Sequence, residues 1–123
     1  MHNKVLIIDD APDIVRLVEF ELNFEGYEVK TAWAGKEGIE LARSFKPDII
    51  LLDYILPEMT GPEVLKLLKS DPELKGIPVI MLSAKTQKKD IESGLAAGAI
   101  GFIEKPFDPS ALSSRMREIL NAA

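Results

Sequence analysis

Three short runs of apolar residues constrain the fold of this 123-residue chain more than any other feature. The runs are Val5–Ile8, Ile49–Leu52 and Val79–Leu82. An unbroken apolar run is typical of a parallel strand covered on both faces, because a strand with one wet face would alternate with polar residues. The polar residues that follow these runs are Asp9, Asp53 and Ser83. The sequence therefore predicts buried parallel strands with polar carboxyl ends.

Two further strands and five helices are predicted from residue periodicity. Residues 27–32 alternate in polarity and residues 100–104 are mixed, which is typical of strands at or near a sheet edge. Helices are predicted where apolar residues recur every three or four positions. The predicted helices begin near Pro12, Gly35, Pro62, Thr86 and Asp108. Strands and helices thus alternate along the whole chain.

The character of each strand also predicts its place in the sheet. Alternating strands and helices favour right-handed crossovers, with helices on both faces of a parallel sheet. The three wholly apolar strands belong in the middle, and the mixed second and fifth strands belong at the edges. We therefore predict an α/β fold with a doubly wound, flavodoxin-like five-stranded parallel sheet in the order 2-1-3-4-5. The length fits a single domain over residues 1–123.

Composition excludes several classes of function. The chain has no cysteine, so it can form no disulfide, thiolate metal site or cysteine nucleophile. A net charge of −5 argues against non-specific binding to nucleic acid or to an anionic membrane. No apolar run approaches the roughly 18 residues of a transmembrane helix, and no signal-peptide core follows Met1. We expect a cytoplasmic protein with no direct contact to nucleic acid or membrane.

The predicted strand order brings several chemical groups to one edge of the sheet. The residues at the strand ends are Asp9, Asp10, Asp53, Ser83 and Lys105. Three neighbouring carboxylates repel one another, which raises the pKa of an aspartate and favours a bound cation. Mg²⁺ fits because it takes oxygen ligands, often one or two carboxylates plus phosphate. An aspartate beside a metal and a lysine can attack phosphorus, since both cations stabilise the transferring group, to which Ser83 can donate.

Each of these residues also has an ordinary structural explanation. The pair Asp9–Asp10 could cap a helix, and Asp53 could be a turn residue. Ser83 could be a loop hydroxyl and Lys105 a solvated charge. The combination, rather than any single residue, indicates phosphoryl chemistry.

The same residues stand in motifs that resemble the receiver domain of response regulators. The matching segments are Ile7–Asp10, Leu51–Asp53, Pro57–Met59 with Gly61, Leu82–Ala84 and Lys105–Phe107. The resemblance extends from Lys4 to the last predicted helix, which is essentially the whole chain. It implies that Asp53 is the phosphoacceptor and that Lys105 contacts the phosphoryl group.

The resemblance also implies a metal site and a switch. Asp10, Asp53 and the backbone carbonyl of Ile55 would ligate Mg²⁺, with Asp9 acting through water. Ser83 takes the position of the switch hydroxyl and Phe102 that of the switch aromatic. Phosphorylation would draw Ser83 toward the new oxygens and let Phe102 turn into the vacated space, which changes the surface of the fourth helix, fifth strand and fifth helix.

Further expectations concern geometry and lifetime. The Lys105–Pro106 bond is expected to be cis, which proline permits at low cost. Ile55 cannot position a hydrolytic water by hydrogen bonding, so we expect slow self-dephosphorylation, although Lys85 and Tyr54 could instead gate access. Phe102 could equally be an ordinary edge-strand aromatic. Gly94 interrupts the fourth predicted helix, which is consistent either with movement or with close packing.

The implied partners are a sensor histidine kinase or phosphotransfer protein and a downstream protein target. Ile14 and Pro106–Phe107 are the expected kinase-docking positions. The segment Gly98–Phe102 lacks the acidic pair of the winged-helix transcription-factor branch, so we expect a monomer or a weak dimer linked to phosphorylation.

Three classes of function remain open. The first is a phosphorylation-controlled receiver that catalyses only its own phosphorylation and dephosphorylation. The second is a receiver-like interaction module that is independent of phosphate. The third is a Mg²⁺-dependent phosphohydrolase with an aspartate nucleophile, which commonly carries an acid at the position that Ile55 occupies.

Overall fold

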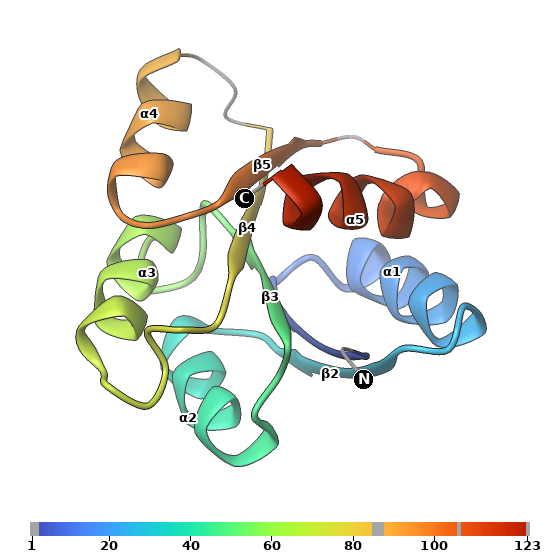
Figure 1. Cartoon of the computed structure of the whole chain (residues 1–123), viewed down its shortest axis with the longest axis horizontal. Helices are drawn as coiled ribbons and strands as arrows, with labels where there is room; N and C mark the ends of the chain where they lie inside the picture. Colours follow the sequence, from blue (N-terminus) through green and yellow to red (C-terminus); the bar gives the residue numbers. More distant parts are fainter. Residues whose placement is uncertain (1–2, 85–87, 106, 123) are drawn as a thin grey trace.

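Five strands alternate with five helices in the computed structural model, which describes residues 3–84, 88–105 and 107–122 (Figure 1). The strands are β1 (Lys4–Ile8), β2 (Glu28–Ala32), β3 (Ile49–Asp53), β4 (Val79–Ser83) and β5 (Gly101–Glu104). The helices are α1 (Pro12–Phe24), α2 (Gly35–Phe45), α3 (Gly61–Ser70), α4 (Lys88–Ala96) and α5 (Leu112–Ala122). The predicted start of the fourth helix at Thr86 lies outside the described residues.

All five strands form one parallel sheet in the order β2-β1-β3-β4-β5. This order confirms the prediction from strand character. Every residue of β3 and β4 is buried, whereas β2 alternates between exposed and more buried positions. Central parallel strands need apolar side chains on both faces, while an edge strand can leave part of itself in water.

Two layers of helices cover the sheet. α2, α3 and α4 lie on one side of it in Figure 1, and α1 and α5 lie on the other. Two separate apolar clusters fill the interfaces: one contains Leu6, Leu52 and Leu65, and the other contains Ile7 and Val18. Successive residues of a strand point to opposite faces, so the unbroken apolar runs supply both clusters at once. The predicted doubly wound α/β architecture is therefore confirmed.

The helix ends explain how the loops at the carboxyl edge of the sheet are held. Pro12 begins α1, where its missing N–H would have no partner within the helix. Thr60 caps α3 through a reciprocal capping box with Glu63. Asp108 accepts hydrogen bonds from the Ser110 backbone and hydroxyl. It caps a short 3₁₀ turn (Pro109–Ala111), and α5 begins only at Leu112, which is later than predicted.

None of the helices in the described segments is both long and apolar enough to cross a membrane.

Candidate functional site

The strand ends converge on one edge of the sheet, as predicted. Asp9 follows β1, Asp53 and Ser83 end β3 and β4, and Lys105 follows β5. Asp9, Asp53 and Ser83 are buried, whereas Asp10 is exposed. We call this set the carboxyl rim: Asp9, Asp10, Asp53, Ser83 and Lys105. Residues from four separate segments of the sequence thus belong to one local structure.

Lys105 makes its closest ion pair with Asp9. Its Nζ lies 2.7 Å from Asp9 Oδ2 and 3.5 Å from Asp53 Oδ2. The Lys105 backbone N–H donates to the Ser83 carbonyl at 2.8 Å, which fixes the end of β5 beside the end of β4. The ammonium group therefore faces two carboxylates at once.

Asp9 also supports the start of a helix, which is the structural alternative that the sequence left open. Its Oδ1 accepts the Ala11 backbone N–H at 2.9 Å, at the residue that precedes α1. Its own N–H donates to the Ala32 carbonyl at 3.1 Å. The Asp9 side chain thus supports the start of α1 with one oxygen and pairs with Lys105 through the other.

The three aspartates of the rim can offer one carboxylate oxygen each within 4.8 Å of one another. Burial, together with the charge of Asp9, raises the pKa of Asp53 to about 6, and the charge of Lys105 opposes this rise. Three carboxylates beside one lysine leave an excess of negative charge, which a divalent cation would compensate. This donor set, made only of oxygens, fits Mg²⁺.

The loop after β3 turns back on itself beside Asp53. The Ile55 backbone N–H points at Asp53 Oδ1 at 3.5 Å, and Ile55 pairs with Thr60 in a short antiparallel bridge. A Cβ added at Gly61 would lie 2.4 Å from the Asp53 carbonyl oxygen. Only glycine allows this close approach. Gly61, the first residue of α3, can therefore contact the backbone of Asp53, the proposed acceptor. The Ile55 side chain is exposed.

The two proposed switch residues occupy adjacent strands. Ser83 is buried at the end of β4, and Phe102 lies half-buried in β5, paired in register with Met81. A Cβ at Gly94 would make ordinary contacts, 3.4 Å from Met81 Cγ and 3.6 Å from the Phe102 ring. Gly94 therefore lies close to the Phe102 ring, but lack of space does not require glycine at this position. The position of Phe102 is that of an aromatic on an edge strand, partly in the core.

Some expectations fall on residues that are not described. Pro106 and Lys85 are among them, so the cis bond and the gating role suggested for Lys85 lie outside the described residues, whereas Tyr54 is described and half-buried. Two features of the site were not predicted from the sequence. The capping box is visible as Thr60-x-x-Glu63, a known helix-start pattern. The shorter distance from Lys105 to Asp9 than to Asp53 has no counterpart in the sequence.

Comparisons with known proteins agree on one family. Residues 5–117 match the family model for the response regulator receiver domain. The alkaline phosphatase synthesis transcriptional regulatory protein PhoP of Bacillus subtilis is 39% identical over 120 residues, which is 98% of this chain and 49% of that protein. The DNA-binding response regulator MtrA of Mycobacterium tuberculosis is 35% identical over 117 residues, covering 95% of this chain and 50% of that protein.

The structural comparison gives the same result. The chemotaxis response regulator CheY4 of Vibrio cholerae superposes with a TM-score of 0.90 at 34% sequence identity, covering 97% of this chain and 99% of that one. This chain spans about half the length of PhoP and of MtrA.

Proposed function

Because this chain belongs to the response regulator receiver domain family, we propose that it is a phosphorylation-activated signalling receiver acting as a single unit over residues 1–123. In this proposal Asp53 accepts a phosphoryl group from a histidine kinase or phosphotransfer protein, with Mg²⁺ bound. The observation that supports it best is the meeting of three aspartate oxygens within 4.8 Å, with Lys105 bridging Asp9 and Asp53.

The residues of the rim divide the chemistry among them. A carboxylate oxygen of Asp53 attacks phosphorus in line with the leaving group, a new O–P bond forms, and the bond to the donor breaks. The Lys105 ammonium stabilises negative charge on the phosphoryl oxygens. Asp10, Asp53 and the Ile55 carbonyl would hold Mg²⁺, with Asp9 acting through water. The ion would supply positive charge that allows the carboxylates and the phosphoryl group to approach.

The proposed output is a change in the surface formed by α4, β5 and α5. The buried Ser83 hydroxyl would donate to the phosphoryl group, and Phe102 would turn toward the space that it leaves. Phe102 lies against Gly94 of α4, so its movement would change the contact between α4 and the sheet. This surface would bind a downstream protein target.

An exposed apolar stripe on α1 supports docking of a protein phosphodonor. Leu17, Phe20 and Phe24 are 54%, 70% and 81% exposed and recur at helical spacing. They lie opposite the buried face of α1, which includes Val18. Exposed aromatic residues in a row are typical of protein contact sites. Ile14, nearer the rim and half-buried, and Phe107 would extend this surface toward Asp53.

Receiver domains are generally not classical enzymes, and we expect this one to catalyse only its own phosphorylation and dephosphorylation. We propose a cytoplasmic monomer, or a weak dimer linked to phosphorylation, without direct contact to nucleic acid or membrane. The DNA-binding activity that the name of MtrA states belongs to that protein.

The lifetime of the phosphoryl group is proposed to be long. The Ile55 side chain is exposed beside Asp53 and has no hydrogen-bonding group to orient an attacking water. Substitution Ile55→Asn should therefore accelerate decay of the phosphorylated protein, followed by intact mass. An unchanged decay rate would show that this side chain does not set the lifetime.

Incubation with Mg²⁺ and acetyl phosphate tests the function directly. We expect one stable phosphoryl group per chain by intact mass, absent in Asp53→Asn and absent when the metal is chelated. Asp13→Asn is a suitable control, because Asp13 is an exposed acid in the first turn of α1. Continuous release of phosphate without stable label would favour a phosphohydrolase. No label and no turnover would favour an interaction module that is independent of phosphate.

A further inference from the structure

The loop between β3 and α3 has an unusual backbone at its tip. Glu58 has a φ of 66°, and the Met59 N–H donates to the Pro57 carbonyl at 2.8 Å. A bond between residues two apart around a residue with positive φ defines the rare, strained form of the γ-turn. In the described part of the chain, the non-glycine residues with positive φ are Lys46 and Glu58. Glutamate has a Cβ that disfavours this conformation.

The strained tip closes a hairpin that contains the proposed metal ligand. Ile55 pairs with Thr60, and the accompanying hydrogen bond runs from the Gly61 N–H to the Tyr54 carbonyl at 2.7 Å, one residue outside the pair. Ile55 and Thr60 therefore form a non-hydrogen-bonded pair, whose own N–H and C=O groups point outward from the hairpin. The Ile55 N–H faces Asp53 Oδ1, so its carbonyl is on the side of the rim.

Packing around the hairpin explains why the strained turn persists. The Thr60 N–H donates to Glu63 Oε1 at 3.2 Å, and the Glu63 N–H donates to Thr60 Oγ1 at 3.3 Å. On the other side, a Cβ added at Gly35 would lie 3.0 Å from Met59 Sδ, so Met59 packs against the start of α2. Residues on both sides of Glu58 are thus fixed by neighbouring elements. Strain of this kind survives only where its surroundings determine the backbone.

We propose that Glu58 is a positioning residue for the metal site: its left-handed backbone closes the hairpin and thereby holds the Ile55 carbonyl toward Mg²⁺. This inference rests on the proposed function, because it assumes that the rim binds the ion. The Glu58 side chain is exposed, so the role belongs to the backbone of this residue. The turn lowers the stability of the fold in exchange for a fixed ligand.

Substitution Glu58→Gly separates this role from an ordinary structural one. Glycine adopts positive φ without steric penalty, so the strain is relieved and the melting temperature should rise by roughly 2 to 6 °C. The tip would also gain access to other conformations, so the Mg²⁺ dissociation constant should rise by about 3- to 10-fold. If Glu58 only supported the fold, the substitution would raise both the melting temperature and the Mg²⁺ affinity, or lower both.

Two matched variants complete the experiment. Lys46→Gly relieves the other positive φ, 53° at the end of α2, and should raise the melting temperature while leaving Mg²⁺ affinity unchanged. Glu58→Gln removes the charge of Glu58 but keeps its Cβ, and should bind Mg²⁺ like the wild type. Affinity is measured by titrating Mg²⁺ alone into each variant of the 123-residue chain while the amide NMR signals of residues 53–61 are followed.

The outcomes distinguish this inference from the proposed function. If the wild type shows no saturable shift at the rim, the proposed magnesium site fails and the inference fails with it. If the wild type binds Mg²⁺ but Glu58→Gly binds equally well, only the role of Glu58 is overturned. Equal weakening in Glu58→Gln and Glu58→Gly would assign the effect to charge. A lower melting temperature in Glu58→Gly would show that the turn is not strained.

Discussion

Two ion pairs in this protein have the same length and very different surroundings. Lys105 Nζ lies 2.7 Å from Asp9 Oδ2, and Arg43 Nη2 lies 2.7 Å from Asp71 Oδ2. The Lys105 and Asp9 side chains are 15% and 1% exposed, against 51% and 18% for Arg43 and Asp71. The two distances are equal, but one pair is buried and the other is largely exposed, so the two pairs contribute differently to stability.

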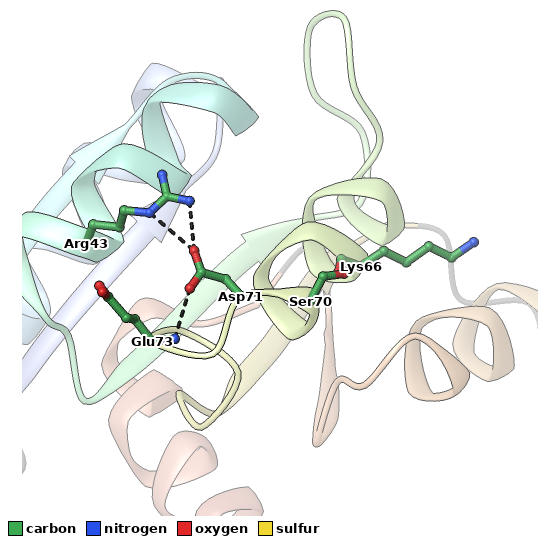
Figure 2. A network of polar contacts seen from close by, with 5 residues as sticks. All are labelled: Arg43, Lys66, Ser70, Asp71 and Glu73. Atoms are coloured by element: carbon green, nitrogen blue, oxygen red, sulfur yellow. Dashed lines mark hydrogen bonds and ion pairs between the residues drawn. The ribbon is translucent and has the colours of Figure 1, made fainter.

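In the Arg43–Asp71 pair, one positive charge faces one negative charge, and both Asp71 oxygens have hydrogen-bond donors. Figure 2 shows two guanidinium nitrogens of Arg43, Nε and Nη2, directed at one Asp71 oxygen. The other Asp71 oxygen accepts the Glu73 N–H at 2.9 Å. Asp71 is the C-cap of α3, so the pair joins α2 to the end of α3. Since α3 begins beside Asp53, its ten residues place this end about 15 Å along the helix from the rim.

The charges at the rim are not balanced in the same way. Lys105 faces both Asp9 and Asp53, and Asp10 adds a third carboxylate within 4.8 Å. Among the described residues, one lysine therefore stands beside three acids. The Arg43–Asp71 contact thus joins two elements with balanced charge, whereas the rim keeps a local negative charge that a divalent cation would compensate.

The largest difference should appear when the cationic partner is removed from the rim. Lys105→Met leaves the buried Asp9 carboxylate beside two other acids without a cation. We expect it to lower the free energy of unfolding by about 2 to 3 kcal/mol in metal-free buffer, measured by urea denaturation. Mg²⁺ should restore part of the loss. A loss no greater than that in Arg43→Met would contradict the distinction between the two pairs.

A smaller effect of opposite sign is expected for Asp53→Asn. The pKa of Asp53 is about 6 in the fold against an ordinary value of 3.8, so its ionisation destabilises the metal-free fold as the pH rises from about 4 to about 6. Removing the charge should stabilise the protein by about 1 to 2 kcal/mol at pH 8, allowing for screening by water, and hardly at all at pH 3.5.

Unfolding curves across this pH range, recorded with a chelator, provide the check. Wild-type stability relative to Asp53→Asn should decrease with rising pH and recover when Mg²⁺ is added. A constant difference at all pH values would mean that the acceptor carboxylate is not perturbed by its surroundings.

The rim end of α3 allows an intermediate test. Thr60→Ala removes the hydroxyl that caps the rim end of this helix and should cost about 1 kcal/mol of stability. Thr60→Ser keeps the hydroxyl and should retain most of that stability. Thermal unfolding of the two variants decides the point, and equal melting temperatures would show that the capping hydroxyl contributes little.

The smallest effect should come from the exposed pair. Arg43→Met should change the melting temperature by about 1 °C or less near neutral pH. The hydrogen bond from Arg43, together with that from the Glu73 backbone, lowers the pKa of Asp71. The contribution of the pair should therefore be present above the ordinary carboxyl pKa and disappear at more acidic pH. High salt should reduce it further, and insensitivity to salt would argue against an exposed pair.

The sequence predicted the fold because the signals were redundant. Continuous apolar runs distinguished the central strands from β2 and β5, and that distinction determined the sheet order. Asp53, Asp9 and Lys105 could then be placed together, since parallel strands end at one edge.

Details that depend on tertiary contacts could not be predicted in this way. Arg43 and Asp71 are 28 residues apart, and neither stands in a pattern that links them. The positive φ of Glu58 also has no local signal, because glutamate is not a residue that favours this conformation. The choice of Asp9 by Lys105 depends on side-chain placement between strands that are distant in the sequence.

The most direct test of the central claim is to identify the residue that carries the phosphoryl group. Protein treated with acetyl phosphate and Mg²⁺ is reduced with borohydride, which converts an aspartyl phosphate to homoserine, and the peptides are sequenced by mass spectrometry. The account predicts modification at Asp53 alone. Modification at Asp9 or Asp10 instead, or equal modification in the Asp53→Asn variant, would contradict it.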